Sequence, residues 1–405
     1  MNKIELLAPA GDMSKLKTAF YFGADAAYIG GKAMNLRAGA GNFSNEEIIE
    51  AVRYAHNLGK KIYVTVNIFA RNYDIENAAE YLVFLEQANI DGVIISDAGL
   101  VALSKKVAPN LKINLSTQAN TLNYAAAEFW KNQGVKRVIL ARELSLEEIS
   151  KIHSKVPDIE LETFIHGAMC IAYSGRCLLS DYRAGRSSNR GECVQACRWN
   201  YEIREKGSQT EYMELCEDDR GTYILNSKDL NLIDYIAQLS SAGVCSFKIE
   251  GRMKSEYYLA TVINAYRRAI DAYYEYGASY KDDLQFKNEL EKTAHREFTT
   301  AYLLGENTQT VNYCDSQSRG SCKFIAVVTK DGNGEYIEAE MRNRFAVGDK
   351  LEVLSPGDNF NKIIEVEKMT DENGFDISDA KIVQQKIKIY TALPLKKGDI
   401  LRKKI

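Results

Sequence analysis

Short apolar runs alternate with amphipathic stretches over roughly the first 275 residues of this 405-residue chain. Stretches such as NEEIIEAVRYAHNLG and DIENAAEYLVFLEQANI place apolar residues at helical spacing. Parallel strands that are covered on both faces are almost continuously apolar, so the short runs predict buried strands. Eight runs fit, at residues 4–8, 26–30, 61–67, 92–97, 112–118, 136–141, 159–165 and 246–251.

The spacing of these runs favours an α/β fold of the (β/α)8, TIM-like barrel type. Gaps of about 20 to 34 residues fit one βα repeat, but about 80 residues separate the seventh run from the eighth. Loops that follow the carboxyl ends of barrel strands lie on the catalytic face, so this insertion, residues 168–245, should cover the site. A doubly wound open sheet is the alternative, since one sequence does not reveal strand order.

The pattern changes after the eighth run. Residues 254–277 and 281–298 predict two helices, and alternating segments such as YIEAEMR and KIKIYTAL follow, separated by the turn sequences DGNG, SPGD and DENG. We therefore expect a barrel domain at 1–275, a helical connector at 276–320 and a small C-terminal antiparallel β-barrel domain at 321–405.

Composition narrows the class of protein. Apolar and charged fractions of 45% and 26% are typical of globular proteins, and no apolar run approaches the length of a membrane span. The start MNKIELLAPAGD lacks the apolar core of a signal peptide, so we expect a cytoplasmic protein without a membrane partner. The net charge of −3 gives no global nucleic-acid signature, and any RNA contact would need a local basic surface.

Four of the eight cysteines lie in the insertion, with the spacing C-x6-C-x15-C-x3-C: Cys170, Cys177, Cys193 and Cys197. In a reducing compartment, clustered cysteines more often bind metal or act in redox chemistry than form disulfides. Four thiolates suit a tetrahedral zinc or an iron–sulfur cluster, and the spacing does not choose between them. Four reduced thiols without metal are a third alternative, but the polar loop sequence DYRAGRSSNRGE between them favours a metal.

Further polar residues follow the predicted strands, where a barrel would bring them to one face. They are Ser116, Gln118 and Asn120 after the fifth, Arg142 and Glu143 after the sixth, His166 after the seventh, and Lys248, Glu250 and Arg252 in or after the eighth. Gln118, His166 and Glu250 are the catalytic candidates. Each residue also has a structural explanation: Arg142 and Glu143 precede a helix with a Ser145–Glu148 capping box, and Lys248 and Glu250 could form an ion pair.

Several motifs in the chain resemble peptidase family U32, the collagenase-like family, over essentially its whole length. They occur in order: ELLAPAGDMSKLKTAFYFGADAAYIGG, STQAN, the cysteine block with HGAMCIAYSGRCLLS, NSKDL and FKIEGRMKS. Within that family, CVQACRWNY, SKDLNLI and the C-terminal β segment resemble the branch responsible for tRNA 5-hydroxyuridine formation.

The resemblance implies an oxygen-independent tRNA hydroxylase. A wobble uridine would gain a hydroxyl at ring carbon five, with prephenate as co-substrate and hydroxyl donor. An iron–sulfur cluster, of the 4Fe–4S type, would be held by the four clustered cysteines, with Cys216 or Cys245 as substitutes for the fourth ligand. The implied partners are tRNA, the small-molecule donor and a cluster-assembly or paralogous protein.

Substrate-binding candidates follow from these expectations. A base splayed into a pocket can stack on aromatic rings or guanidinium planes, and the insertion interleaves both kinds of side chain. Equally, these side chains could shield the cluster or form a solvated loop. Prephenate is a dicarboxylate, which suits cationic clamps. The candidates are Arg183, Arg186 and Trp199 for RNA, and Arg142, Lys248 and Arg252 for the donor.

Two other functions compete. The family name proposes a collagenase-like peptidase, although the chain has neither H-E-x-x-H nor G-x-S-x-G, and only His166 of its four histidines follows a predicted strand at the catalytic face. A Cys170–His166 nucleophile pair is the arrangement that remains for proteolysis. The third class is a non-catalytic RNA-binding protein with a structural zinc.

Overall fold

The structure is a computed structural model. It describes residues 3–35, 41–199, 217–218, 221–222, 227–277, 284–305 and 318–405.

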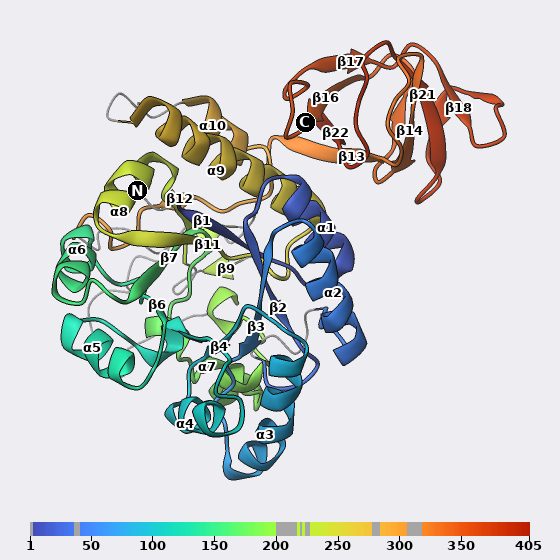
Figure 1. The fold of residues 1–405 in the computed structure, drawn as a ribbon. Coiled ribbons are helices and arrows are strands. Elements are labelled where there is room, and N and C mark those ends of the chain that lie inside the picture. Colours follow the sequence, from blue (N-terminus) through green and yellow to red (C-terminus); the bar gives the residue numbers. More distant parts are fainter. Residues whose placement is uncertain are drawn as a thin grey trace.

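Eight parallel strands close into a barrel (Figure 1). They are β1 (Glu5–Pro9), β2 (Ala26–Gly30), β3 (Lys61–Val66), β4 (Gly92–Ile95), β5 (Ile113–Leu115), β6 (Arg137–Ile139), β7 (Glu160–Ala168) and β11 (Val244–Ile249). The order runs from β11 through β1 to β7, and β7 pairs with β11 to close the ring. The predicted barrel is confirmed, and the open-sheet alternative is wrong because no edge is left between β7 and β11.

The main disagreement in the barrel strands concerns the fifth. The run at 112–118 was expected to be extended throughout, but β5 ends at Leu115 and a short 3₁₀ helix, η1 (Thr117–Ala119), follows. The Ser116 hydroxyl caps it by accepting from the Gln118 amide. This turn places the side chains after β5 above the barrel mouth.

Helices cover the outside of the barrel. They are α1 (Met13–Tyr21), α2 (Asn45–Asn57), α3 (Asn72–Gln87), α4 (Ala98–Val107), α5 (Tyr124–Asn132), α6 (Leu146–Lys155), α8 (Ile236–Ser241) and α9 (Glu256–Tyr276). Side-chain caps begin most of them, and the predicted capping box of Ser145 and Glu148 at α6 is confirmed. The caps therefore fix where several βα loops end, at the same face as the carboxyl ends of the strands.

Charged side chains fill part of the barrel interior. Glu162 on β7 is fully buried and accepts from Lys248 Nζ at 3.0 Å and from Arg137 Nη1 at 3.0 Å. Arg137 also pairs with Glu5. Lys248 thus forms a buried ion pair with Glu162, whereas the structural alternative for Lys248 named Glu250 as its partner.

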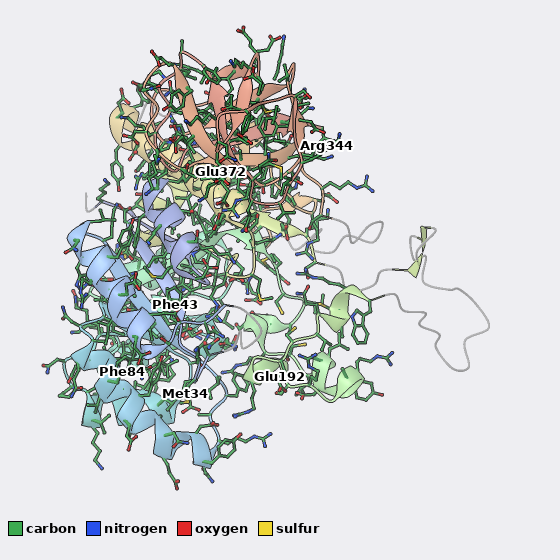
Figure 2. All side chains as sticks on the ribbon, turned by 90° about the vertical axis from the view of Figure 1, so that its right-hand side faces the viewer. Met34, Phe43, Phe84, Glu192, Arg344 and Glu372 are labelled. Atoms are coloured by element: carbon green, nitrogen blue, oxygen red, sulfur yellow. The ribbon has the colours of Figure 1, made fainter. Side chains whose placement is uncertain are left out.

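The insertion lies over the carboxyl ends of the strands. Its described elements are η2 (Tyr173–Gly175), α7 (Leu179–Ala184), η3 (Ser188–Arg190), η4 (Ala196–Arg198), β8 (Glu217–Asp218), β9 (Gly221–Thr222) and β10 (Asp229–Asn231). Figure 2, where Glu192 marks the insertion, shows it on one side of the barrel. β10 pairs antiparallel with β7 and parallel with β12 (Phe298–Thr299).

The C-terminal part forms a curled antiparallel sheet. Its strands are β13 (Cys322–Val328), β14 (Tyr336–Met341), β16 (Lys350–Leu354), β17 (Ile363–Glu365), β18 (Met369–Asp371), β19 (Asp376–Ile377), β21 (Lys386–Tyr390) and β22 (Ile400–Lys404). A separate pair joins β15 (Phe345–Ala346) to β20 (Asp379–Ala380). The helix expected at 281–298 ends earlier than predicted: among the described residues α10 spans Leu284–Leu290, and the chain then turns and enters β12 (Phe298–Thr299).

The sheet docks on the barrel through buried contacts. Arg402, which is fully buried, donates to the Glu289 carboxylate of α10, and the rings of Tyr257 and Phe324 stack with centroids 5.6 Å apart. Leu354 and Ile400 join the barrel's apolar core. Among the described helices, none is long and apolar enough to cross a membrane.

Candidate functional site

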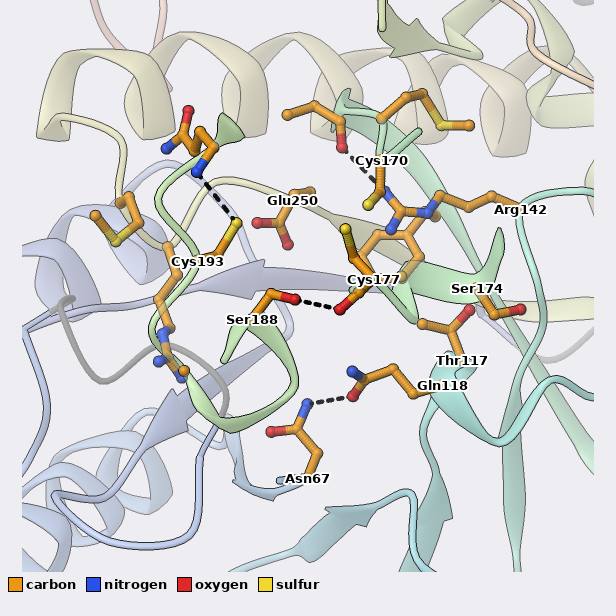
Figure 3. Close-up of a pocket in the computed structure, with 18 of the residues that line it drawn as sticks. Asn67, Thr117, Gln118, Arg142, Cys170, Ser174, Cys177, Ser188, Cys193 and Glu250 are labelled. Carbon is orange, nitrogen blue, oxygen red and sulfur yellow. Dashed lines mark hydrogen bonds between the residues drawn. The ribbon is translucent and has the colours of Figure 1, made fainter. Parts of the chain in front are cut away.

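A pocket of about 340 Å³ opens where the insertion meets the carboxyl ends of the barrel strands (Figure 3). Strand-end residues such as Thr65, Phe164 and Lys248 line it from below, and residues of the insertion line it from above. This is the face where TIM barrels assemble their active sites from loops.

Four thiols line this pocket: Cys170, Cys177, Cys193 and Cys197. The Leu179 amide donates to Cys177 Sγ at 3.3 Å, and the Gln195 amide donates to Cys193 Sγ at 3.4 Å. Burial raises the pKa of the Cys197 thiol, Arg198 lowers it, and the charges of the other three thiols raise it further.

The thiols are a donor set that fits a four-thiolate metal centre. The described side chains contain no group of three or more Cys, His, Asp or Glu already arranged to hold an ion. Cys216, one expected substitute ligand, lies outside the described residues. The other, Cys245, is wrong for that role: it lies near the amino end of β11, where Cys245 Sγ donates to the Leu161 carbonyl at 3.4 Å, and it does not line the pocket.

Cations dominate the pocket's charged lining. The carboxylate that lines it is Glu250, against six cationic side chains: Arg142, Arg186, Arg198, Lys248, Arg252 and Lys254. Burial lowers the pKa of Lys248, and the Glu162 carboxylate opposes that shift. Such a pocket attracts anionic ligands.

Two of the arginines are held in place by neutral partners. Arg252 is buried and donates to Asn35 Oδ1 at 2.6 Å and to Thr65 Oγ1 at 3.2 Å. A Cβ on Gly30 would collide with the Arg252 guanidinium, so a larger residue there would displace that group. Arg142 donates to the Ala168 carbonyl at 2.9 Å, with its guanidinium 4.7 Å from the Phe164 ring centroid. Both cations are thus oriented before any ligand binds.

Two neutral or acidic candidates also line the pocket. Gln118 Oε1 accepts from Asn67 Nδ2 at 3.2 Å. In Figure 3 the Gln118 amide nitrogen points away from this hydrogen bond. Glu250 Oε2 accepts from the Tyr28 hydroxyl at 3.2 Å. Each group has one polar atom engaged by the barrel, which fixes its orientation.

Comparison with known protein families shows which family this chain belongs to. The model described as "Peptidase family U32" matches residues 11–313, and the one described as "Peptidase family U32 C-terminal domain" matches residues 320–402. The chain belongs to peptidase family U32.

Three U32-like relatives carry different names. "tRNA hydroxylation protein P1" of Bacillus subtilis is 41% identical over 98% of this chain and 95% of its own length. "23S rRNA 5-hydroxycytidine C2501 synthase" of Escherichia coli is 35% identical over 87% of this chain and 53% of its own length. "Collagenase" of Porphyromonas gingivalis is 33% identical over 76% of this chain and 75% of its own length.

Three of the catalytic, substrate-binding and cysteine candidates lie outside the pocket lining of this U32 chain, as do two further polar residues expected at this face, Asn120 and Glu143. Arg183 on α7 and Trp199 after η4 are exposed, and Trp199 keeps 41% of its surface accessible. His166 is buried, with its ring against Tyr258, Tyr266 and Phe298. The remaining candidates, including all four clustered cysteines, come together around one cavity.

Other pocket residues were absent from the sequence-based set. Thr65 and Asn67 line it at the end of β3, and Lys254, which precedes α9, adds a cation. Arg198 also lines it and was expected, as one of the arginines that the insertion interleaves with aromatic residues. Thr65 and Asn67 stand in VTVN, so the rule that found Ser116 and Gln118 after the fifth strand would have found them too.

Ser174 joins the insertion to two barrel loops. Its amide donates to Glu143 Oε1 at 2.8 Å, and its hydroxyl bonds to Asn120 Oδ1 at 2.7 Å. Ser174 and Asn120 both adopt left-handed backbone conformations, with φ of 51° and 58°. Arg176 adds a bond from its Nε to the Gln118 carbonyl at 2.6 Å. Glu143 and Asn120 therefore hold the thiol-bearing loop in place over the pocket.

The buried imidazole of His166 should make the protein acid-sensitive. Burial lowers the pKa of His166 to about 3 from 6.5, so unfolding takes up a proton at intermediate pH. Stability is then lost as pH falls from about 6.5 towards 3, by about 2 kcal/mol at pH 5. His166→Phe, which suits the aromatic surroundings, should reduce the fall in urea midpoint between pH 7 and pH 5. An equal fall in the variant and the parent would contradict this assignment.

Proposed function

We propose that this U32 protein is a tRNA hydroxylase that forms 5-hydroxyuridine at the wobble position without dioxygen. The observation that carries the proposal is the convergence of four thiols and six cations in one pocket at the carboxyl ends of the barrel strands. The names of the Bacillus subtilis and Escherichia coli relatives support hydroxylation of RNA, and the second supports carbon five of a pyrimidine.

The thiols have a place in this chemistry. Replacing C–H by C–OH at a ring carbon removes two electrons from the base, and the reaction balances when the donor's C–OH carbon takes up those two electrons and a proton as it gives up its oxygen. Cys170, Cys177, Cys193 and Cys197 would hold a 4Fe–4S cluster. When bound, such a cluster would supply Lewis-acidic iron and a carrier for single electrons.

The cations would bind the hydroxyl donor. Prephenate carries two carboxylates, and Arg142 and Arg252 present oriented guanidinium groups that suit carboxylates. Lys248 would contribute a positive charge at the bottom of the pocket, where its ammonium group donates a hydrogen bond to Glu162. These three side chains would orient the donor above the strand ends and exclude bulk water from it.

Gln118 and Glu250 would serve the base. Gln118, with its oxygen engaged by Asn67, would donate from Nε2 to a uracil carbonyl. Glu250 is the carboxylate that lines the pocket, and it would accept the proton that leaves carbon five. The catalytic prediction for His166 gains no support from its position, because its ring packs against aromatic residues, its Nδ1 lies 3.5 Å from the Tyr266 hydroxyl, and it does not line the pocket. A cytoplasmic location and a cluster-assembly or paralogous partner stay predictions.

Peptidase activity is the second candidate, favoured by the relative named "Collagenase". A Cys170–His166 pair would be its nucleophile, but His166 is buried beside Tyr266 and Phe298 while Cys170 lines the pocket. The low pKa of His166, about 3, also makes it a poor general base.

The test is nucleoside analysis of tRNA from bacteria in which this chain replaces their own U32 hydroxylation protein. We expect 5-hydroxyuridine or its derivatives to be restored by the parent chain and lost with Glu250→Gln, while Tyr276→Ala, a substitution at the end of α9, changes nothing. In parallel, the protein purified without oxygen is assayed on collagen. Absence of the nucleoside together with collagen cleavage would replace the hydroxylase proposal with the peptidase one.

A further inference from the structure

Large apolar side chains stand exposed on the segments that contribute residues to the pocket lining. Tyr182, Leu178 and Tyr173 are 85%, 73% and 51% exposed. Met253 and Trp199 add 57% and 41%. We call these five residues the insertion rim. Leu178 and Tyr182 stand four residues apart, joined by the bond from the Tyr182 amide to the Leu178 carbonyl, and so share one face of α7.

Four of the five rim residues line the pocket or adjoin a lining residue in the sequence. Met253 lines the pocket itself, Leu178 is flanked by the lining residues Cys177 and Leu179, and Tyr173 precedes the lining residue Ser174. An occupant of the rim would therefore continue into the cavity where the thiols lie.

The charge of this segment differs from that of the whole chain. Residues 173–199 contain five arginines against Asp181 and Glu192, a net of +3, whereas the chain carries −3. Arg190 pairs with Asp74 and braces the insertion on α3. Arg183 and Arg186 are exposed, and Arg186 also lines the pocket. The exposed apolar groups are thus interleaved with cations instead of forming a continuous apolar plate.

We propose that the insertion rim is a stacking platform for the unpaired nucleotides that flank the target base in an RNA loop. Tyr182 and Tyr173 offer ring faces to bases, and Arg183 and Arg186 meet the phosphates. Double-stranded RNA keeps its bases stacked and paired, so it cannot use the ring faces. The net positive charge favours a nucleic acid over a collagen-like peptide. This inference rests on the proposed function and assigns the residues that would deliver the RNA to the pocket.

Binding to two RNA probes tests the platform. The full chain, purified without oxygen, is titrated into a fluorescent RNA hairpin whose loop carries unpaired uridines, and into the same stem closed as a continuous duplex. Tyr182→Ala should weaken hairpin binding about 5- to 150-fold, as expected for one lost base stack, and leave duplex binding unchanged. Tyr276→Ala, at an exposed tyrosine at the far end of α9, is the matched control.

The salt dependence tests the arginines separately. Arg183→Gln should reduce the slope of log Kd against log salt by about 0.7, the value for one phosphate contact on a single strand. Arg53→Gln on α2 is the control and should keep the parent slope. If Tyr182→Ala and Arg183→Gln both bind the hairpin as the parent does, the platform is wrong. It is also wrong if a collagen-like peptide competes with the hairpin for the parent chain and the rim variants no longer bind that peptide.

RNA binding and nucleoside formation together distinguish a wrong stacking platform from a wrong proposed function. If the parent chain restores the hydroxylated nucleoside but the rim variants bind the hairpin normally, the platform is wrong and the function stands. If rim-dependent hairpin binding is found without any hydroxylated nucleoside, the RNA surface stands and the hydroxylase proposal falls.

Discussion

Replacing any one of Cys170, Cys177, Cys193 or Cys197 by alanine is expected to remove the bound iron and to reduce hydroxylation by more than about 100-fold. Loss of a residue that only supports a metal ligand typically costs 10- to 100-fold, so loss of a ligand should cost more. All four thiols line one pocket, so all four single variants should behave alike.

The measurement combines iron, sulfide and zinc analysis with visible spectra of protein purified without oxygen, followed by nucleoside analysis of tRNA. Cys245→Ala is the matched control, since that thiol is free and half-buried, like those of Cys170, Cys177 and Cys197, but does not line the pocket. We expect it to keep iron and activity. A colourless parent protein that holds zinc, or a Cys193→Ala variant with full iron content, would contradict the four-cysteine cluster.

Replacing Arg252 by methionine is expected to raise the apparent KM for prephenate by about 10- to 150-fold. That range corresponds to the 1.5–3 kcal/mol of a hydrogen bond to a charged group. Methionine can fill much of the space of the buried arginine stem, so the main loss should be the guanidinium. Arg252→Lys keeps the positive charge but loses the planar, two-pronged guanidinium, so its KM for prephenate should lie between those of the parent and of Arg252→Met.

The donor dependence is measured by nucleoside formation at varied prephenate with the anaerobic protein. Iron content and thermal unfolding of each variant show whether the pocket is intact, because Arg252 also bonds to Asn35 and Thr65. Arg53→Met, on the exposed side of α2, serves as the control substitution. A parent-like KM in Arg252→Met with intact iron would remove Arg252 from donor binding.

The expected effects separate the two halves of the site. Thiol variants should lose iron and activity together, whereas Arg252 variants should keep iron and lose affinity for the donor. The rim variants should keep their iron and their affinity for the donor, and should lose affinity for RNA. Three different measurements thus address three groups of residues that surround one cavity.

The sequence alone determined the barrel strands and the clustering of the thiols. Buried parallel strands leave continuous apolar runs, which is why all eight were found, and the long gap before β11 located the insertion. Residues directly after strands must lie near one face of a barrel, which is why Gln118, Arg142 and Arg252 were placed near the pocket.

Tertiary structure alone decided which side chains face the pocket. On β7, Phe164 pairs with Lys248 but His166 pairs with Ile249, so Ile165 is an extra residue in the ladder. Strand side chains alternate with a period of two, and one extra residue reverses the faces that follow it. Phe164 therefore faces the pocket, while His166 faces Tyr266 on α9. Such an irregularity depends on the pairing of two strands about 80 residues apart, which the local pattern of apolar residues does not record.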